Sequence, residues 1–140
     1  MILRLLTSIA IIISTSSCDS FVLKSRFKTK ETEKTFEKAQ EYEMNGELDK
    51  AISYYDKADQ LSPENPIILH ARGLAKSSIK KYESSIIDLN KSIELTEEKD
   101  LKEIRIGNRA LTYMEMGNME KACEDWKKCN AMNYIKKYCK

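Results

Sequence analysis

The chain has 140 residues, of which 41% are hydrophobic and 33% are charged. This composition favours one ordered domain and excludes an intrinsically disordered chain. The 24 basic and 22 acidic residues are interspersed, so there is no basic stripe of the kind that binds nucleic acid. Only four glycines and two prolines interrupt the chain, which indicates a mostly helical fold.

The first 17 residues have the pattern of a secretory signal peptide. Arg4 precedes an apolar stretch over residues 5–13, and small residues separate this stretch from Cys18. The apolar stretch is too short to span a bilayer, which takes about 20 residues. We therefore expect residues 1–17 to act as a targeting signal and to take no part in the folded domain.

The position of Cys18 directly after the small residues 14–17 resembles the lipobox of bacterial lipoproteins, although Thr15 stands where leucine is commonest. The resemblance implies that Cys18 is lipidated and anchors the protein in the cell envelope, facing the periplasm, with the inner or outer membrane left open. A soluble secreted protein and an uncleaved anchor are the alternatives. Residues 18–31 would form the lipidated cysteine and a tether, whose basic residues could also lie near anionic lipid headgroups.

A pattern of small, aromatic and turn-forming residues occurs three times after residue 32. In the first copy the pattern is Ala39, Tyr42, Gly46, Ala51, Tyr55 and Ala58. The third copy has Ala110, Tyr113, Gly117, Ala122, Trp126 and Cys129 at the same spacing. The second copy has Gly73, Lys76, Lys80, Ser85, Leu89 and Ser92, so lysines replace the tyrosine and the glycine. Small residues let two helices approach closely, and large residues fill the gaps between them.

This pattern resembles the tetratricopeptide repeat. We predict an all-α solenoid over residues 32–140, with helix-turn-helix repeats at 32–65, 66–99 and 103–136 and a short C-terminal capping helix. The predicted helices span residues 31–45, 48–61, 66–79, 82–95, 101–116, 119–131 and 134–139. Asn65 with Pro66 predicts one helix start, and Asp100 with Glu103 predicts another through a capping box. We expect Tyr134, Ile135 and Tyr138 to form the cap.

No constellation of residues predicts catalysis, a metal site or a cofactor. His70 is the only histidine, and it lacks the partners that a catalytic or metal triad needs, so we interpret it as a groove-lining contact or an ordinary half-exposed residue. The carboxylates are scattered along amphipathic helices. Glu124 and Asp125 are interpreted as a solvated face beside Trp126.

Three cysteines remain beside Cys18, and no Cys-x-x-Cys motif is present. Cys129 occupies a small-residue position of a repeat, which predicts a buried core thiol. Cys123 lies on the same predicted helix, and Cys139 lies on the capping helix that should pack against it. A disulfide between Cys123 and Cys139 and two free thiols are both open at this point.

First helices of tetratricopeptide repeats line a concave surface, and the resemblance implies which residues face it. The predicted groove residues are Phe36, Gln40, His70, Leu74, Ser77, Asn108, Leu111 and Met114. These apolar and neutral residues suit an extended peptide or a partner helix, and Leu74, Leu111 and Met114 could instead pack within the domain. The carboxylate clamp of chaperone-binding relatives is essentially absent, because its positions hold Phe36, Gln40, Ala71, Ile104 and Asn108.

The sequence thus predicts a non-catalytic protein interaction module or scaffold anchored to a membrane through its N-terminal lipid. No nucleic acid or small-molecule substrate is indicated. The alternative is a structural or self-associating envelope subunit that acts through the ends of its repeats. An enzyme or redox protein that uses His70 or the free cysteines is a third hypothesis. The ACEDWKK run at 122–128 is similar to runs in short repeat proteins of Bacteroidetes-type bacteria.

Overall fold

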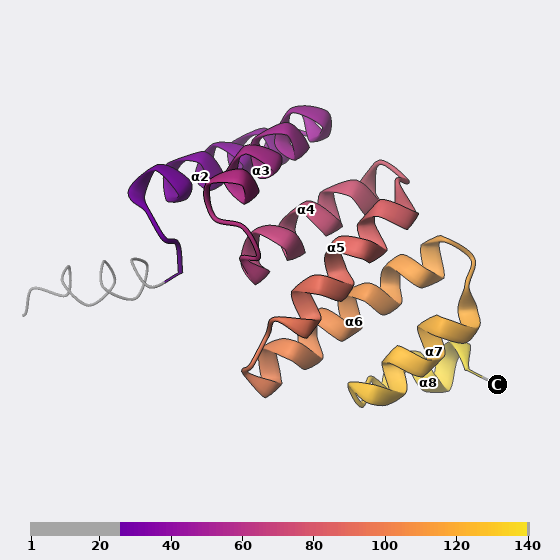
Figure 1. Cartoon of the computed structure of the whole chain (residues 1–140). Coiled ribbons are helices and arrows are strands. Elements are labelled where there is room, and N and C mark those ends of the chain that lie inside the picture. The colour runs from indigo at the N-terminus through magenta and orange to yellow at the C-terminus, as the bar shows by residue number, and fades with distance from the viewer. Residues whose placement is uncertain (1–25, 140) are drawn as a thin grey trace, which may run out of the picture.

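The computed structural model describes residues 26–139, so the predicted signal peptide, Cys18 and the tether up to residue 25 lie outside the described residues. The described part of the chain forms seven α-helices and no strand. These helices are α2 (Lys30–Met44), α3 (Leu48–Leu61), α4 (Pro66–Ser78), α5 (Tyr82–Glu94), α6 (Lys99–Glu115), α7 (Met119–Lys128) and α8 (Met132–Tyr138). Three helix pairs, α2–α3, α4–α5 and α6–α7, stack side by side and form a solenoid, and α8 packs against α7 at its end (Figure 1). The prediction of an all-α solenoid with a short terminal helix is confirmed.

Side chains just before α2, α4, α6 and α7 satisfy backbone N–H groups that have no partner inside the helix. The Asn65 side chain accepts from the N–H of Ile67 at 2.9 Å, and Pro66 is the first residue of α4, as predicted. The predicted capping box at Asp100 is wrong. The N-cap is Glu98, whose two carboxylate oxygens accept from the N–H groups of Asp100 and Leu101, each at 3.0 Å, so α6 begins two residues earlier than predicted.

The turn inside each helix pair has one residue in the left-handed region. Gly46 has a φ of 75° and Gly117 a φ of 84°, as expected for glycine at the end of a first helix. Lys80 occupies the same place in the second pair with a φ of 62°. The second repeat therefore keeps the turn although it lacks the glycine, at the expense of a strained lysine backbone.

Helix α7 has 10 residues and ends earlier than the predicted helix over 119–131, whereas α3 has 14. Asn130, just after α7, has a φ of 52°, and asparagine tolerates this conformation better than most residues. The chain turns back there, so α8 starts at Met132 and packs against α7.

Two apolar cores lie at the two ends of the domain. The first joins α2, α3 and α4 and consists of Phe36, Ala39, Ala51, Ile52, Tyr55, Ala58, Ile68 and Ala75. The second is built on Ala110, Ala122 and Trp126, with α8 packed against it. Between the two cores, α5 buries Ser85, Asp88 and Ser92 beside Leu89. The middle of the solenoid is therefore held together largely by polar contacts.

Candidate interaction surface

The first helices α4 and α6 lie next to each other and are bridged by two polar contacts. Nδ2 of Asn108 lies 3.0 Å from Nε2 of His70, and the Ser77 hydroxyl donates to Glu115 at 3.0 Å. Each contact joins residues 38 positions apart without passing through a second helix. These contacts define a surface made by first helices alone. We call the exposed and half-buried residues Gln40, His70, Leu74, Leu101, Ile104 and Asn108 the first-helix face.

Ile104 is the most exposed apolar residue of this face, because 60% of its surface is open. It precedes Asn108 by one helical turn and therefore lies on the same side of α6. Leu101, one turn earlier, is also exposed. An exposed apolar strip beside neutral polar side chains is chemistry that suits a protein segment.

Four of the predicted groove residues are less available than the sequence indicated. Phe36 is only 7% exposed, because its ring packs between Phe27 at 5.0 Å and Tyr55 at 5.4 Å. Ser77 is buried under its contact with Glu115. Leu111 and Met114 pack against the core around Trp126. Leu111 and Met114 are half-buried, as are His70, Leu74 and Asn108, but these last three residues and the exposed Gln40 do not belong to either apolar core.

The environment of His70 keeps its ring neutral at pH 7. Burial lowers the pKa of His70 to about 4, and the positive charge of Arg105 adds to this lowering. The amide nitrogen of Asn108 can only donate, so Nε2 of His70 accepts and the ring proton is on Nδ1. The pair thus offers a neutral hydrogen-bonding edge to a partner, without a cation.

Two arginine–aspartate ion pairs were not predicted from the sequence. Arg72 holds Asp88 through Nε and Nη2, both at 2.8 Å, and Arg109 holds Asp125 in the same way at 2.7 and 2.8 Å. The interpretation of Asp125 as part of a solvated face is wrong, since only 2% of it is exposed. The signal was present in the sequence, because both pairs have a spacing of 16 and recur in consecutive repeats. They join first to second helices and are structural.

Arg105 is a buried arginine without a carboxylate partner among the described residues. Nη1 donates to the carbonyl and the hydroxyl of Ser92 and to the hydroxyl of Thr96, and Nε has no partner among residues 26–139. These acceptors lie at the C-terminal end of α5, where the helix dipole favours a positive charge. Burial lowers the pKa of Arg105. Arg105 therefore closes the end of α5 beneath the first-helix face.

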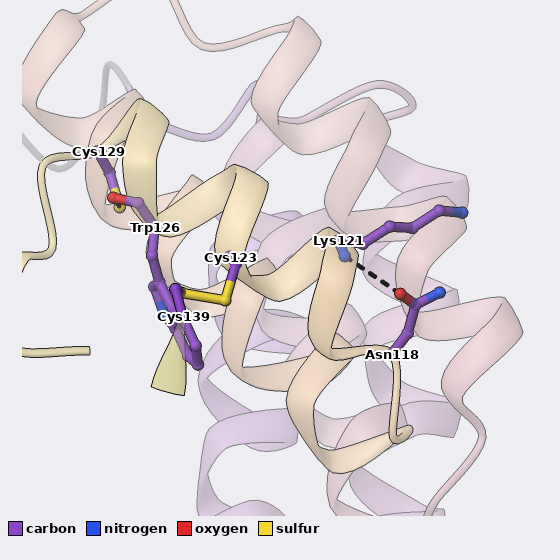
Figure 2. The surroundings of a disulfide bond; sticks show 6 residues. All are labelled: Asn118, Lys121, Cys123, Trp126, Cys129 and Cys139. Carbon is purple, nitrogen blue, oxygen red and sulfur yellow. Dashed lines mark hydrogen bonds between the residues drawn. A yellow bond between two sulfur atoms is a disulfide. The ribbon is translucent and has the colours of Figure 1, made fainter. Parts of the chain in front are cut away.

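The C-terminal end combines a disulfide with an aromatic stack. Cys123 of α7 and Cys139, directly after α8, form a disulfide beside Trp126 (Figure 2). The rings of Tyr134 and Tyr138 lie 4.9 and 5.7 Å from that of Trp126. Cys129 was predicted to be a buried core thiol; it packs against the core around Trp126 but is only half-buried, because it lies after the end of α7. Burial raises the pKa of the Cys129 thiol, which makes it a poor nucleophile.

A known protein family matches this chain once over each of the three helix pairs. The profile described as tetratricopeptide repeat matches residues 30–65, 67–99 and 106–136, which cover α2–α3, α4–α5, and most of α6 together with α7 and the beginning of α8. The chain belongs to the tetratricopeptide repeat family. Tetratricopeptide repeats generally bind protein partners and are generally non-catalytic. No curated protein gave a significant match to the chain.

Residues 26–139 contain no group of three histidine, cysteine or carboxylate side chains that could hold a metal ion. Over the same residues, every helix is too short or too polar to cross a membrane.

Proposed function

We propose that this protein is a non-catalytic interaction module that holds a protein partner at the membrane of a bacterial envelope. The observation that carries the proposal is the exposed apolar strip of Ile104 and Leu101 on the first-helix face, next to the His70–Asn108 pair. Membership of the tetratricopeptide repeat family supports a protein partner. The partner segment would be an extended peptide or a helix.

The chemistry of the surface favours a partner segment with apolar and neutral side chains. His70 carries no charge at pH 7, and its Nε2 is already engaged by Asn108. The positions of a carboxylate clamp hold the buried Phe36 and the exposed Ile104, neither of which can bind a carboxylate. An acidic C-terminal motif is therefore a poor fit.

Anchoring through Cys18 is the second part of the proposal. The start of the described chain is fixed to the domain, because Asn65 donates to the carbonyl of Arg26 at 2.7 Å and Phe27 packs on Phe36. A lipid on Cys18 would therefore hold the end of the domain that carries the starts of α2 and α4 near the membrane. Metabolic labelling with a palmitate analogue should mark the wild-type protein and not Cys18→Ser. Labelling of Cys18→Ser would contradict the anchor.

Self-association through the ends of the solenoid is the alternative, and the register of the repeats argues against it. The residues of α4 that pack toward α3 are apolar, namely Ile67, Ile68, Ala71, Ala75 and Ile79. The residues at the same register on the outer side of α2 are Glu33, Lys34, Glu37, Glu41 and Asn45. A polar outer face is typical of a terminal repeat that stays solvated. At the other end, α8 covers α7.

Two matched substitutions test the interaction surface. Ile104 and Ile87 are 60% and 68% exposed, so glutamate at either position should leave the fold intact. Ile104 lies on the first-helix face, whereas Ile87 lies on the second helix α5. After crosslinking and affinity purification from native membranes, Ile104→Glu should lose the partner, and Ile87→Glu should retain it. Retention of the partner by both variants would refute binding through this face.

A further inference from the structure

The cap α8 is a short helix with few contacts of its own. It has seven residues, none of them buried, and no side chain caps its N-terminus. Its apolar contacts with the domain are made by Tyr134, Ile135 and Tyr138 against the core around Trp126. An isolated helix of this length is not stable in water, so docking of α8 depends on what attaches it to α7.

The disulfide supplies that attachment. Cys139 is the first residue after α8, and its bond to Cys123 closes a loop over a sequence separation of 16. Closing a loop of that length favours the closed form roughly 100-fold over an open chain. Both sulfurs belong to half-buried residues at the end of the solenoid, and neither residue is fully enclosed by the domain. Opening this loop would not break any helix of the three repeats.

Trp126 lies beneath the cap and is only 1% exposed. It occupies the large-residue position of the third repeat and packs against Ala110 and Ala122 on its inner side. The rings of Tyr134 and Tyr138 stack against it from α8 (Figure 2 shows Trp126 beside the disulfide). Removal of α8 would therefore turn a closed end of the solenoid into an open apolar one.

We propose that the Cys123–Cys139 disulfide is a redox-controlled latch that keeps α8 over Trp126, and that its reduction by a dithiol releases the cap. One thiolate of the dithiol attacks a sulfur of the disulfide, the bond between Cys123 and Cys139 breaks, and a mixed disulfide forms. The second thiol of the reductant resolves it. Two electrons and two protons leave the reductant, which becomes a cyclic disulfide, and both cysteines end as thiols. This device is independent of the first-helix face.

Cys129 does not compete in this exchange. Its thiol lies 3.7 Å from the carbonyl of Trp126, and burial raises its pKa, so little of it is the reactive thiolate at neutral pH. Gly107 of α6 faces its sulfur, which places Cys129 toward the first helix of its repeat. The latch therefore has one defined pair of cysteines, with Cys129 as an internal control.

The single tryptophan of the chain makes the test direct. The full chain, purified from membranes in detergent, is reduced with dithiothreitol, and complete reduction is verified by thiol counting. Tryptophan emission should shift to longer wavelength, and acrylamide quenching should increase several-fold. Amide hydrogen exchange should become at least about tenfold faster in α8 and stay unchanged in α2–α5.

Two variants separate the latch from its alternatives. Cys139→Ser should show the reduced behaviour without reductant, and Cys129→Ser should behave as the oxidised wild type. If Cys139→Ser does not fold, reduction of the folded wild type still tests whether the disulfide holds α8 in place. Unchanged emission and unchanged α8 exchange after complete reduction would overturn the proposal. Loss of protection in α2–α5 together with α8 would overturn it as well, because the disulfide would then stabilise the whole domain.

Discussion

The two halves of the solenoid are stabilised by different kinds of contact. The α2–α4 half buries a continuous apolar cluster around Phe36, Tyr55 and Ile68. The α5–α7 half buries polar groups between its helices, among them Ser92, Arg105 and Asp125. Apolar packing tolerates substitutions of similar volume, whereas buried polar groups depend on each partner being present. The second half should therefore respond more strongly to changes of single polar residues.

The largest expected effect comes from breaking a buried ion pair in the second half. Arg109→Met leaves Asp125 buried, with only the exposed Lys128 at 3.3 Å as a partner. We expect a loss of about 3 kcal/mol in the free energy of unfolding, measured by urea denaturation. Lys38 has the same register in α2, its side chain is 41% exposed, and it forms an ion pair with Glu41, so Lys38→Met should leave the free energy of unfolding nearly unchanged. Equal losses in the two variants would remove the distinction between the halves.

A second test uses two glycines of first helices. A Cβ on Gly73 would lie 2.9 Å from Cγ of Leu89 and 3.3 Å from the carbonyl of Ser85, where α4 approaches α5. Gly73→Ala should therefore lower the free energy of unfolding by about 2 kcal/mol. A Cβ on Gly107 meets only the sulfur of Cys129, at 3.7 Å, so Gly107→Ala should be neutral or stabilise by up to about 1 kcal/mol. Destabilisation by both alanines would show that close approach is not specific to Gly73.

The third test is the pH dependence that His70 adds where the halves meet. The folded-state pKa of about 4 is below the unfolded value of 6.5, so the folded state favours the neutral ring. The resulting stabilisation is complete above pH 6.5 and is lost as the pH falls from 6.5 toward 4. Allowing for screening by solvent, we expect a loss of about 1 kcal/mol that His70→Gln should not show. NMR titration of this single histidine measures the pKa itself, and a value near 6.5 would contradict burial.

The smallest expected effect concerns the strained turn of the second repeat. Lys80 has a φ of 62°, which a residue with a side chain adopts less readily than glycine. Lys80→Gly should raise the free energy of unfolding by somewhat less than 1 kcal/mol, and thermal denaturation would detect the higher midpoint. Gly46→Ala in the first repeat is the reverse change at the same register and should lower the midpoint. A lower midpoint for Lys80→Gly would indicate that Lys80 makes compensating contacts.

The sequence was sufficient for the repeats because their signals are local. Ala39, Tyr42 and Gly46 lie within one helix and its turn, so their spacing indicates the helix pair without knowledge of its neighbours. The ends of the helices were less predictable. Glu98 is an uncommon N-cap residue, and Asn130 ends α7 early through its backbone conformation. Helix propensity alone therefore predicts neither the start of α6 after Glu98 nor the end of α7 before Asn130.

The candidate site was harder to predict because burial depends on residues that are distant in the sequence. Phe36 has a groove position by register, but Phe27, from outside the repeat pattern, covers it. Leu111 has the same kind of position and packs instead against the core around Trp126. Arg105 stands where the previous repeat has the buried Ile68, so hydrophobic patterning could not mark it as a core residue. These cases explain why Ile104, and not Leu111, is the better probe of the surface.

Site-specific photocrosslinking tests the central claim, that a protein partner occupies the first-helix face. A photoreactive amino acid is placed at Ile104 or at Ile87 in the full chain, and native membranes are irradiated before the adducts are identified. We expect one dominant protein adduct from position 104 and none from position 87, since the two sites are similarly exposed but lie on α6 and α5 respectively. An adduct from position 87 alone, or no protein adduct from position 104, would contradict it.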